Sequence, residues 1–502
     1  MNRFWPTTRI GQFFLMLTIF LMVELLSFAS FFSEMMQNVL LVFFTLAFIL
    51  IALKNYSWAL VLLILELILG SKGYLFAFNQ GETLVSLRLA WFITAIAIFV
   101  VNILKYHRWK ALNHKLVYGW LLALLAISWG AVNGLFNNSF TDWFLDLNGY
   151  LYLLIFLPLL CYQKTIWFKL KSVVAPALIY LAVKTLYYLY LYSHFPADSL
   201  LPLYHWFRDT GFGEITYISG NFFRIFSQSQ IFILIAVVAW FIYWLILAHK
   251  RNQSTYTLVK HNFLLYLGGL ILTATLLASF SRSFWLAAGV TLVIGLISYV
   301  IIRRPQVKHV LDYLGFSLLT AVASAGLLLA ITQFPIPTPL AAVDSQLFVS
   351  RASQGASEAA GASRLQLLGP LWQGIQTQWL GGGGFGSTVA YYTSDPRITK
   401  STAGGSGLVT TYAFEWGYLD IWLKLGLIGL LLYLSFWLYL FKKGISYLPS
   451  DNVVWFILLA ALAIAITNLT TPYLNHPLGI GSLVILGLYI NWHLNEISEQ
   501  TI

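Results

Sequence analysis

The stretch NFLLYLGGLILTATLLASFSRSFWLAAGVTLVIGLISYVII, residues 262–302, contains a single charged residue, Arg282. This arginine separates two apolar runs, each about long enough to cross a hydrocarbon core of roughly 30 Å as a helix. Similar runs recur along all 502 residues, of which 59% are hydrophobic and only 9% are charged. A soluble domain has about a quarter of its residues charged. The sequence therefore predicts an all-α, polytopic bundle of transmembrane helices.

The apolar runs give fourteen candidate spans, and because Glu66 weakens the third, we expect 12–14 spans. They cover residues 10–32, 36–53, 57–77, 84–104, 116–136, 143–162, 172–194, 226–249, 262–280, 283–302, 313–334, 418–441, 453–472 and 477–493. With the N-terminus in the cytoplasm, most of the 29 lysines and arginines fall on inside segments. Cytoplasmic loops are enriched in these residues, so both termini are expected inside. We expect residues 1–502 to form a single integral membrane domain whose first span is a signal anchor.

Composition argues against several other classes of protein. The chain has one cysteine, Cys161, so no intrachain disulfide can form. No Cys/His cluster has metal-ligand spacing, so we expect neither a metal nor another cofactor. In a membrane protein, lysines and arginines chiefly determine which loops face the cytoplasm. The net charge of +11 is explained in this way, so no nucleic-acid partner is expected.

Two of the expected outer segments are long, residues 195–225 and residues 335–417. Loops of this length are usually functional or disordered. The first contains Arg208 and leads to Arg224 in GNFFRIFSQSQ, residues 220–230. The second contains SRLQLLGPLWQGIQTQWLGGGGFGS, residues 363–387, where Leu365, Leu368, Leu371, Trp372 and Ile375 have helical spacing. The sequence therefore predicts a helix inside the larger outer loop.

Three arginines, Arg224, Arg282 and Arg364, are expected on the outer side, against the usual bias of basic residues. Each has a simple explanation, as an interfacial anchor that snorkels to the headgroups or as a solvated loop residue. Together they would suit a diphosphate, since the planar guanidinium binds phosphate oxygens through two hydrogen bonds.

The run GGGGFG, residues 381–386, lacks the Lys-Ser/Thr pair of a phosphate-binding loop. It is either a flexible turn or a place where the backbone closely approaches a ligand. Glu415 precedes the span at 418–441 and is surrounded by aromatic residues. It could act as a general base or simply pair with a nearby arginine.

Several charged residues fall within the expected spans. Asp420 and Lys424 are four residues apart, so an i,i+4 ion pair is expected. Glu24, Glu66, Asp146 and Lys184 are isolated in apolar runs. Such residues are functional candidates and are often paired within the bundle. We favour structural pairing over a role in transport.

The ordered set of FFRIFSQSQ, ASFSRSFWLAAGVTLVIGLI, SRLQLLGPLWQGIQTQWLGGGGFGS and EWGYLDIWLKLGLIGLLLYL resembles the O-antigen ligase and O-antigen polymerase family. These membrane glycosyltransferases act on undecaprenyl-diphosphate-linked sugars. The resemblance covers residues 220–440, and 335–417 looks like the family's large periplasmic loop. The family often has a histidine eleven residues before a helix glycine, and the matching position before Gly426 is Glu415. A carboxylate would then replace the histidine base.

The resemblance implies metal-independent, inverting glycosyl transfer on the outer face of the bacterial cytoplasmic membrane. A glycan on undecaprenyl diphosphate would pass to a hydroxyl of a glycan or lipid acceptor, in surface polysaccharide ligation or polymerisation. The implied catalytic residues are Glu415, Arg282 and Arg364. The implied substrate-binding residues are Arg224, Arg208, Gly384, Gly386, Trp372 and Tyr418.

Two other functions are compatible with the sequence. A transporter or flippase of polysaccharide or lipid-linked sugars could also have fourteen spans, but would show internal repeats with matched broken helices. No such pair is visible. A non-catalytic membrane assembly factor is the third possibility.

Overall fold

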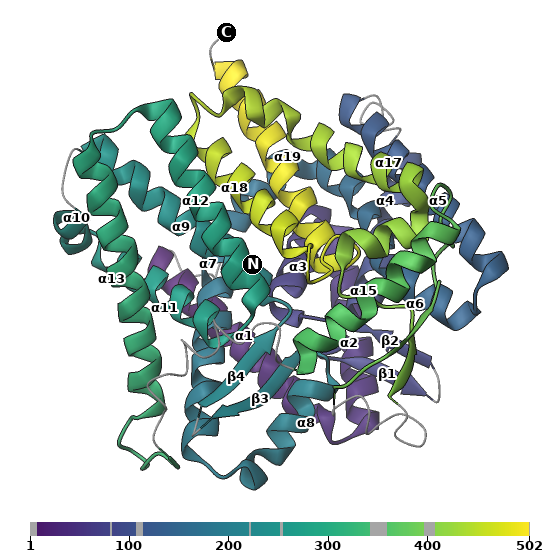
Figure 1. Cartoon of the computed structure of the whole chain (residues 1–502), viewed down its shortest axis with the longest axis horizontal. Coiled ribbons are helices and arrows are strands. Elements are labelled where there is room, and N and C mark those ends of the chain that lie inside the picture. Colours follow the sequence, from purple (N-terminus) through teal and green to yellow (C-terminus); the bar gives the residue numbers. More distant parts are fainter. Residues whose placement is uncertain are drawn as a thin grey trace.

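The computed structural model of the chain describes residues 8–80, 83–106, 114–219, 222–251, 255–341, 359–395 and 407–500. Helices dominate these residues (Figure 1). Ten are long and apolar enough to cross a membrane, and three shorter apolar helices accompany them, Tyr56–Gly70, Phe263–Ala278 and Asn452–Thr467. The prediction of an all-α polytopic bundle is confirmed.

The N-terminal half consists mainly of long helices joined by short connections. They are α1 (Arg9–Phe31), α2 (Glu34–Lys54), α3 (Tyr56–Gly70), α4 (Leu87–Tyr106), α5 (Lys115–Asn137), α6 (Phe140–Leu151) and α7 (Phe156–His194), with a 3-10 turn (Tyr152–Ile155) before α7. The hairpin β1 (Ala77–Gln80) and β2 (Thr83–Ser86) links α3 to α4. Side-chain caps begin several helices; the Ser33 and Ser139 hydroxyls, for example, accept backbone N–H groups at the starts of α2 and α6.

The C-terminal half adds a second group of helices and two further hairpins. Its elements are a 3-10 turn (Ala197–Leu200), α8 (Leu201–Asp209), β3 (Gly213–Ser219), β4 (Phe222–Ser227), α9 (Gln230–Arg251), α10 (Thr255–His261), α11 (Phe263–Ala278), α12 (Arg282–Arg303), α13 (Val307–Thr332), α15 (Ala359–Thr377), β5 (Val389–Tyr392), β6 (Leu408–Thr411), α17 (Gly417–Tyr447), α18 (Asn452–Thr467) and α19 (Pro477–Gln500). The predicted outer segment 195–225 thus holds α8 and most of an antiparallel hairpin in which Thr216 pairs with Arg224.

Burial differs sharply between the helices. α3 is enclosed by its neighbours along almost its whole length and packs against α7. Exposed large apolar side chains instead lie along α1, α2, α4, α5, α12 and α13. This distribution is expected of a bundle whose outer surface is solvated by hydrocarbon, because such a surface needs no polar cover.

The segment 140–194 differs from the prediction of two spans separated by residues 163–171. α6, the 3-10 turn and α7 follow one another without a non-helical break. Its middle contacts the α2–α3 connection, where Lys169 Nζ donates to Asn55 Oδ1 at 3.0 Å. Its two ends contact the chain after α13, through Asp146 to Gly386 and through His194 to Phe334. The two predicted spans are therefore joined by helical residues rather than by a non-helical loop.

The large loop predicted at 335–417 is partly helical, although 342–358 and 396–406 lie outside the described residues. The predicted helix is confirmed as α15. Its buried face consists of Leu367, Leu371 and Ile375, whereas Leu365 and Trp372 are exposed. The expected apolar face is therefore shifted, because α15 packs against β5 and α17 on one side only.

The glycine-rich segment of this loop is inserted beside a break in α17. Gly426 has φ 68° and ψ 176°, so the α17 backbone is not helical there. Gly383 N donates to Leu423 O at 2.8 Å, and Leu427 N donates to Trp379 O at 2.8 Å. The loop thus satisfies backbone groups that the break releases, as irregular backbone inside a membrane protein requires.

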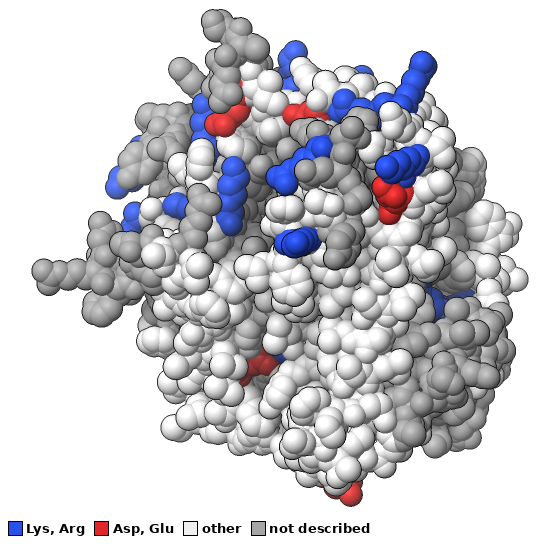
Figure 2. All heavy atoms as spheres, turned by 90° about the vertical axis from the view of Figure 1, so that its left-hand side faces the viewer, with Lys and Arg blue, Asp and Glu red and all other residues white. Residues whose placement is uncertain are grey.

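On one face of the bundle, the two ends differ in charge (Figure 2). The C-terminus lies at the top in Figure 1, whereas β3, β4 and α8 lie at the bottom. On the face shown in Figure 2, lysine and arginine side chains gather towards the top, and the lower half is almost uncharged.

Candidate functional site

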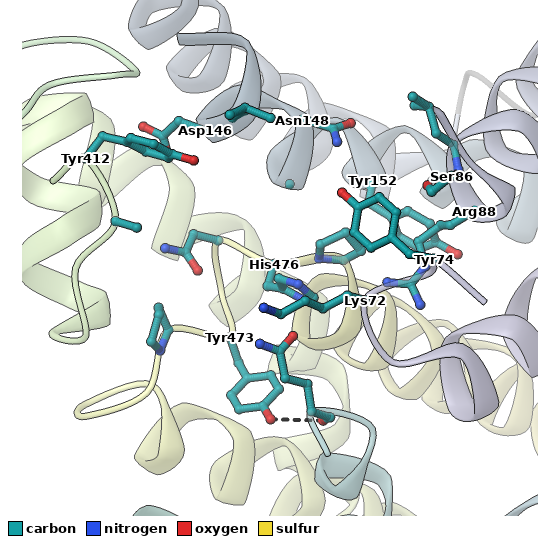
Figure 3. Close-up of a pocket in the computed structure, with 18 of the residues that line it drawn as sticks. Lys72, Tyr74, Ser86, Arg88, Asp146, Asn148, Tyr152, Tyr412, Tyr473 and His476 are labelled. Carbon is teal, nitrogen blue, oxygen red and sulfur yellow. Dashed lines mark hydrogen bonds between the residues drawn. The ribbon is translucent and has the colours of Figure 1, made fainter. Parts of the chain in front are cut away.

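A cavity of about 330 Å³ lies where α4, α6, α17 and β4 meet the segments 412–414 and 471–477 (Figure 3). Pockets of roughly 300–1,000 Å³ are typical of small-molecule sites. Polar side chains from distant parts of the chain line it, including Lys72, Arg88, Asp146, Tyr152, Lys424 and His476. The cavity therefore brings polar and charged side chains together with apolar ones inside the bundle.

One side of the cavity carries cationic and neutral nitrogen donors. Arg88 forms a two-point ion pair with Glu66, Nε donating to Oε2 at 2.7 Å and Nη2 to Oε1 at 3.0 Å. Lys72 and His476 lie beside it. Burial, with the positive charges of Arg88 and Lys72, lowers the pKa of His476 from 6.5 to about 3. His476 is therefore neutral at pH 7.

The opposite side carries a buried ionic network. Lys424 Nζ contacts Asp146 Oδ1 at 2.7 Å and Asp420 Oδ1 at 2.5 Å. Asp420 also accepts from Asn475 Nδ2 at 2.5 Å, and Asp146 accepts from the backbone N–H of Gly386 at 2.8 Å. The expected Asp420–Lys424 pair is confirmed, and Asp146 joins it from α6. The network fixes α6, α17 and the α18–α19 connection around the cavity.

Arg224 and Arg282 are brought to one turn. Arg224 Nε donates to the carbonyl oxygen of Ser279 at 2.9 Å, three residues before Arg282, and its guanidinium lies 4.7 Å from the ring centroid of Phe226. Phe280, within the turn, has φ 46°, which is unfavourable for a bulky residue. Its ring is buried against Phe222. Packing therefore holds this turn in a strained form beside β4.

This turn adjoins the cavity. Phe226, whose ring packs against the Arg224 guanidinium, lines the cavity wall. Ser283, next to Arg282, accepts hydrogen bonds from the hydroxyls of Thr470 at 2.9 Å and Thr471 at 2.8 Å. Thr471 is also part of the lining. The Arg224 guanidinium and the start of α12 therefore lie one layer of side chains from the cavity.

Arg364 and Glu415 are also brought together. Arg364 Nη2 donates to Glu415 Oε1 at 3.1 Å, and Arg364 Nε donates to Oε2. Trp416 Nε1 donates to the Arg364 carbonyl oxygen at 3.0 Å. Pairing of Glu415 with a nearby arginine is thus confirmed, whereas its role as a base stays a prediction. Phe414, one residue before Glu415, lines the cavity.

The other predicted binding residues have different surroundings. Arg208 is exposed on α8 and donates to Tyr204 Oη at 3.4 Å. Trp372 is exposed, and its ring packs edge-on against Trp422. The Tyr418 hydroxyl donates to Ala465 O at 2.9 Å. In the described part of the chain, these three residues do not line the cavity.

The close backbone approach expected of Gly384 and Gly386 is made to neighbouring helices. Gly384 has φ 81°, and a Cβ there would lie 2.1 Å from the backbone nitrogen of Gly134 in α5. Gly386 has φ 80°, and a Cβ there would lie 2.6 Å from Trp143 N in α6. Both glycines therefore pack the loop against the bundle, and Gly386 also supports the cavity through Asp146.

The amino-acid sequence indicated that the buried charges would pair, but no sequence pattern indicated that the pairs of Arg88 and Lys424 meet at one cavity. The pairs Glu24–Lys184, Glu66–Arg88 and Asp146–Lys424 confirm the structural pairing. Arg88 and His476 were not identified as candidates. Their only sequence signal was a charge at the start of an apolar run and a histidine in TPYLNHPLG, residues 471–479.

The sequence of the chain was also compared with known proteins. No protein-family model matches it, and no curated protein matches it.

Proposed function

We propose that this protein is a membrane glycosyltransferase of the O-antigen ligase-like type, which transfers a glycan from undecaprenyl diphosphate to an acceptor hydroxyl. The observation that carries the proposal is that Arg224 binds the turn directly before Arg282, and that this turn adjoins a cavity large enough for a sugar. Guanidinium groups bind diphosphate oxygens, and the cavity wall offers hydrogen-bonding and aromatic side chains to a sugar. The resemblance of residues 220–440 to that family supports the same function.

In the proposed reaction the acceptor hydroxyl oxygen attacks the anomeric carbon of the donor sugar. The new carbon–oxygen bond forms as the bond to the diphosphate breaks, and the diphosphate leaves with the electron pair. Glu415 takes the hydroxyl proton, for which it must loosen its contact with Arg364. Arg282 and Arg224 stabilise the negative charge that develops on the leaving group.

The proposed orientation places both termini in the cytoplasm of a bacterial cell and the cavity at the outer face. The support is the gathering of basic side chains towards the end of the bundle that carries the C-terminus (Figure 2). A lipid-linked donor would then reach the cavity from the outer leaflet.

The test uses the full chain in vesicles that contain the native lipid-linked glycan, with undecaprenyl diphosphate release as the readout. We expect Arg282→Ala to lower kcat by about 10²–10³-fold, as loss of an oxyanion-stabilising donor does. Arg282→Lys should recover part of the rate, since the charge is kept but the fork is lost. Unchanged release in both variants would rule out the diphosphate role. Lys308→Met, at the exposed start of α13, is the matched control.

A transporter remains the second candidate, because the break at Gly426 is the kind of discontinuity that transporters use. The same vesicles separate the two functions. A transferase forms product when donor and acceptor are on one side. A transporter instead moves the donor into a protected compartment and leaves its glycan attached.

A further inference from the structure

The nitrogen-rich side of the cavity has hydrogen-bonding capacity that the protein does not use. Arg88 is 5% exposed and lines the cavity. Its Nε and Nη2 are held by Glu66, whereas its Nη1 is buried and has no hydrogen-bond partner among the residues that the structure describes. A buried donor without a partner loses its hydration and gains no hydrogen bond in return, so a partner for Nη1 is strongly favoured.

His476 adds a second donor. The backbone N–H of Leu478 donates to His476 Nδ1 at 3.3 Å, so Nδ1 acts as the acceptor at the start of α19. In a neutral ring the proton then belongs to Nε2. The low pKa of His476 keeps the ring in this state at pH 7. His476 therefore serves the cavity as a neutral N–H donor rather than as a base.

Lys72 adds an uncompensated charge. Its stem lies on Gly211, where a Cβ would come within 3.0 Å of it. Among the described residues Lys72 has no ion-pair partner, whereas Arg88 is neutralised by Glu66. The net charge at this side of the cavity is therefore positive, and it is set by Lys72.

Groups that suit hydroxyls lie beside these donors. The Tyr152 hydroxyl and the Gln228 side-chain oxygen line the cavity, and within the described part of the chain both are buried without hydrogen-bond partners. Figure 3 shows Tyr152, Tyr74 and Arg88 on one side, with Lys72 and His476 between them and Tyr473. Nitrogen donors next to a free carbonyl acceptor match a molecule that carries both an oxyanion and hydroxyl groups.

We infer that Lys72, Arg88 and His476 form an oxyanion subsite that holds an acidic sugar residue, with Gln228 and Tyr152 bound to its hydroxyls. This subsite is distinct from the Arg224–Arg282 edge. The inference that this subsite binds an oxyanion does not depend on which reaction the protein catalyses. Assignment of the sugar to the transferred glycan rests on the proposed function, and it makes the substrate class an acidic polysaccharide.

The experiment measures binding to the purified full chain in detergent, by the shift in thermal unfolding followed through tryptophan fluorescence. The probes are methyl glucuronide, methyl glucoside and inorganic pyrophosphate. A ligand that binds only the folded chain raises Tm. We expect the glucuronide to bind at least 10-fold more tightly than the glucoside. Lys72→Met should weaken glucuronide binding at least 10-fold, and Lys308→Met should leave it unchanged.

Arg88→Lys is the second variant, since it keeps a charge for Glu66 but removes Nη1, and it should also weaken the glucuronide. A different result would overturn the sugar assignment: the chain binds pyrophosphate, Lys72→Met weakens that binding, and the glucuronide does not bind. The site would then bind the diphosphate. If the affinities for all three probes are the same in Lys72→Met, Arg88→Lys and the wild type, the subsite itself is overturned. The Arg282→Ala variant should still bind the glucuronide. If it binds the glucuronide but no longer transfers the glycan, the defect lies in the reaction and not in the subsite.

Discussion

Arg364 and Glu415 are 51 residues apart in the chain, yet the guanidinium holds both oxygens of the carboxylate. The side chains are 35% and 50% exposed, respectively, so water screens the pair. A screened surface pair contributes only about 0–1 kcal/mol to stability. Its effect on function can therefore be separated from its effect on folding.

Replacement of Glu415 by Gln should leave the protein folded but remove transfer. Loss of the ion pair should lower the free energy of unfolding by less than about 1 kcal/mol. Loss of a general base should lower kcat by about 10²–10⁴-fold. Both are measured on one preparation, by thermal unfolding and by undecaprenyl diphosphate release. A rate close to wild type in Glu415→Gln would show that the carboxylate is only the partner of Arg364.

Replacement of Lys424 by Met should be strongly destabilising. Lys424 is almost fully buried between Asp146 and Asp420, so its removal leaves two carboxylates without a countercharge. Breaking such a network typically costs about 3–5 kcal/mol. Thermal unfolding in detergent and the yield of monodisperse protein provide the measurement. Addition of Asp146→Asn should restore part of the loss, and additive losses in the double variant would contradict the network.

Replacement of Gly426 by Ala should disrupt the contact between α17 and the glycine-rich loop. The φ of 68° and ψ of 176° are accessible almost only to glycine, and a Cβ would lie 2.1 Å from Leu380 O. We expect destabilisation of more than about 2 kcal/mol from strain and collision together. Gly289→Ala in α12 is the control, because its Cβ would meet no atom of the described residues within 4 Å. Equal unfolding temperatures for the two variants would contradict the insertion of the loop.

The neutral state of His476 predicts a particular dependence on pH. Burial and the nearby positive charges lower its pKa from the ordinary 6.5 to about 3 in the folded protein. Between these values only the unfolded chain takes up the proton, so acidification below pH 6.5 destabilises the fold. Above pH 6.5 the contribution disappears. The Tm of the wild type should thus fall more steeply between pH 7 and pH 5 than that of His476→Gln. If Tm depends on pH in the same way in the wild type and in His476→Gln, then His476 is exposed to water and its pKa is not lowered.

Orientation in the membrane can be tested with the single cysteine removed. In the Cys161→Ser background, Arg208→Cys or Lys308→Cys introduces one cysteine. Each variant is then treated in intact cells with a membrane-impermeant maleimide. Arg208 is exposed on α8, and Lys308 is exposed at the start of α13. We expect Arg208→Cys to react from outside and Lys308→Cys only after lysis. The reverse pattern would invert the proposed topology.

The amino-acid sequence alone determined the membrane bundle and part of its charge pairing. Length and hydropathy suffice for spans such as α12, because a helix satisfies its backbone groups within one segment. The Asp420–Lys424 pair was equally local, since residues four apart share a helix face. Arg282 and Glu415 were also found from local context, as charges beside apolar or aromatic runs.

Only the tertiary structure decided which of these groups meet. Lys72, Arg88 and His476 come from three separate parts of the chain, and no local pattern places them at one cavity. The same holds for Arg364 with Glu415, and for the loop that enters the break at Gly426. Contacts between distant segments depend on how whole helices pack, whereas hydropathy records only how each segment meets the bilayer.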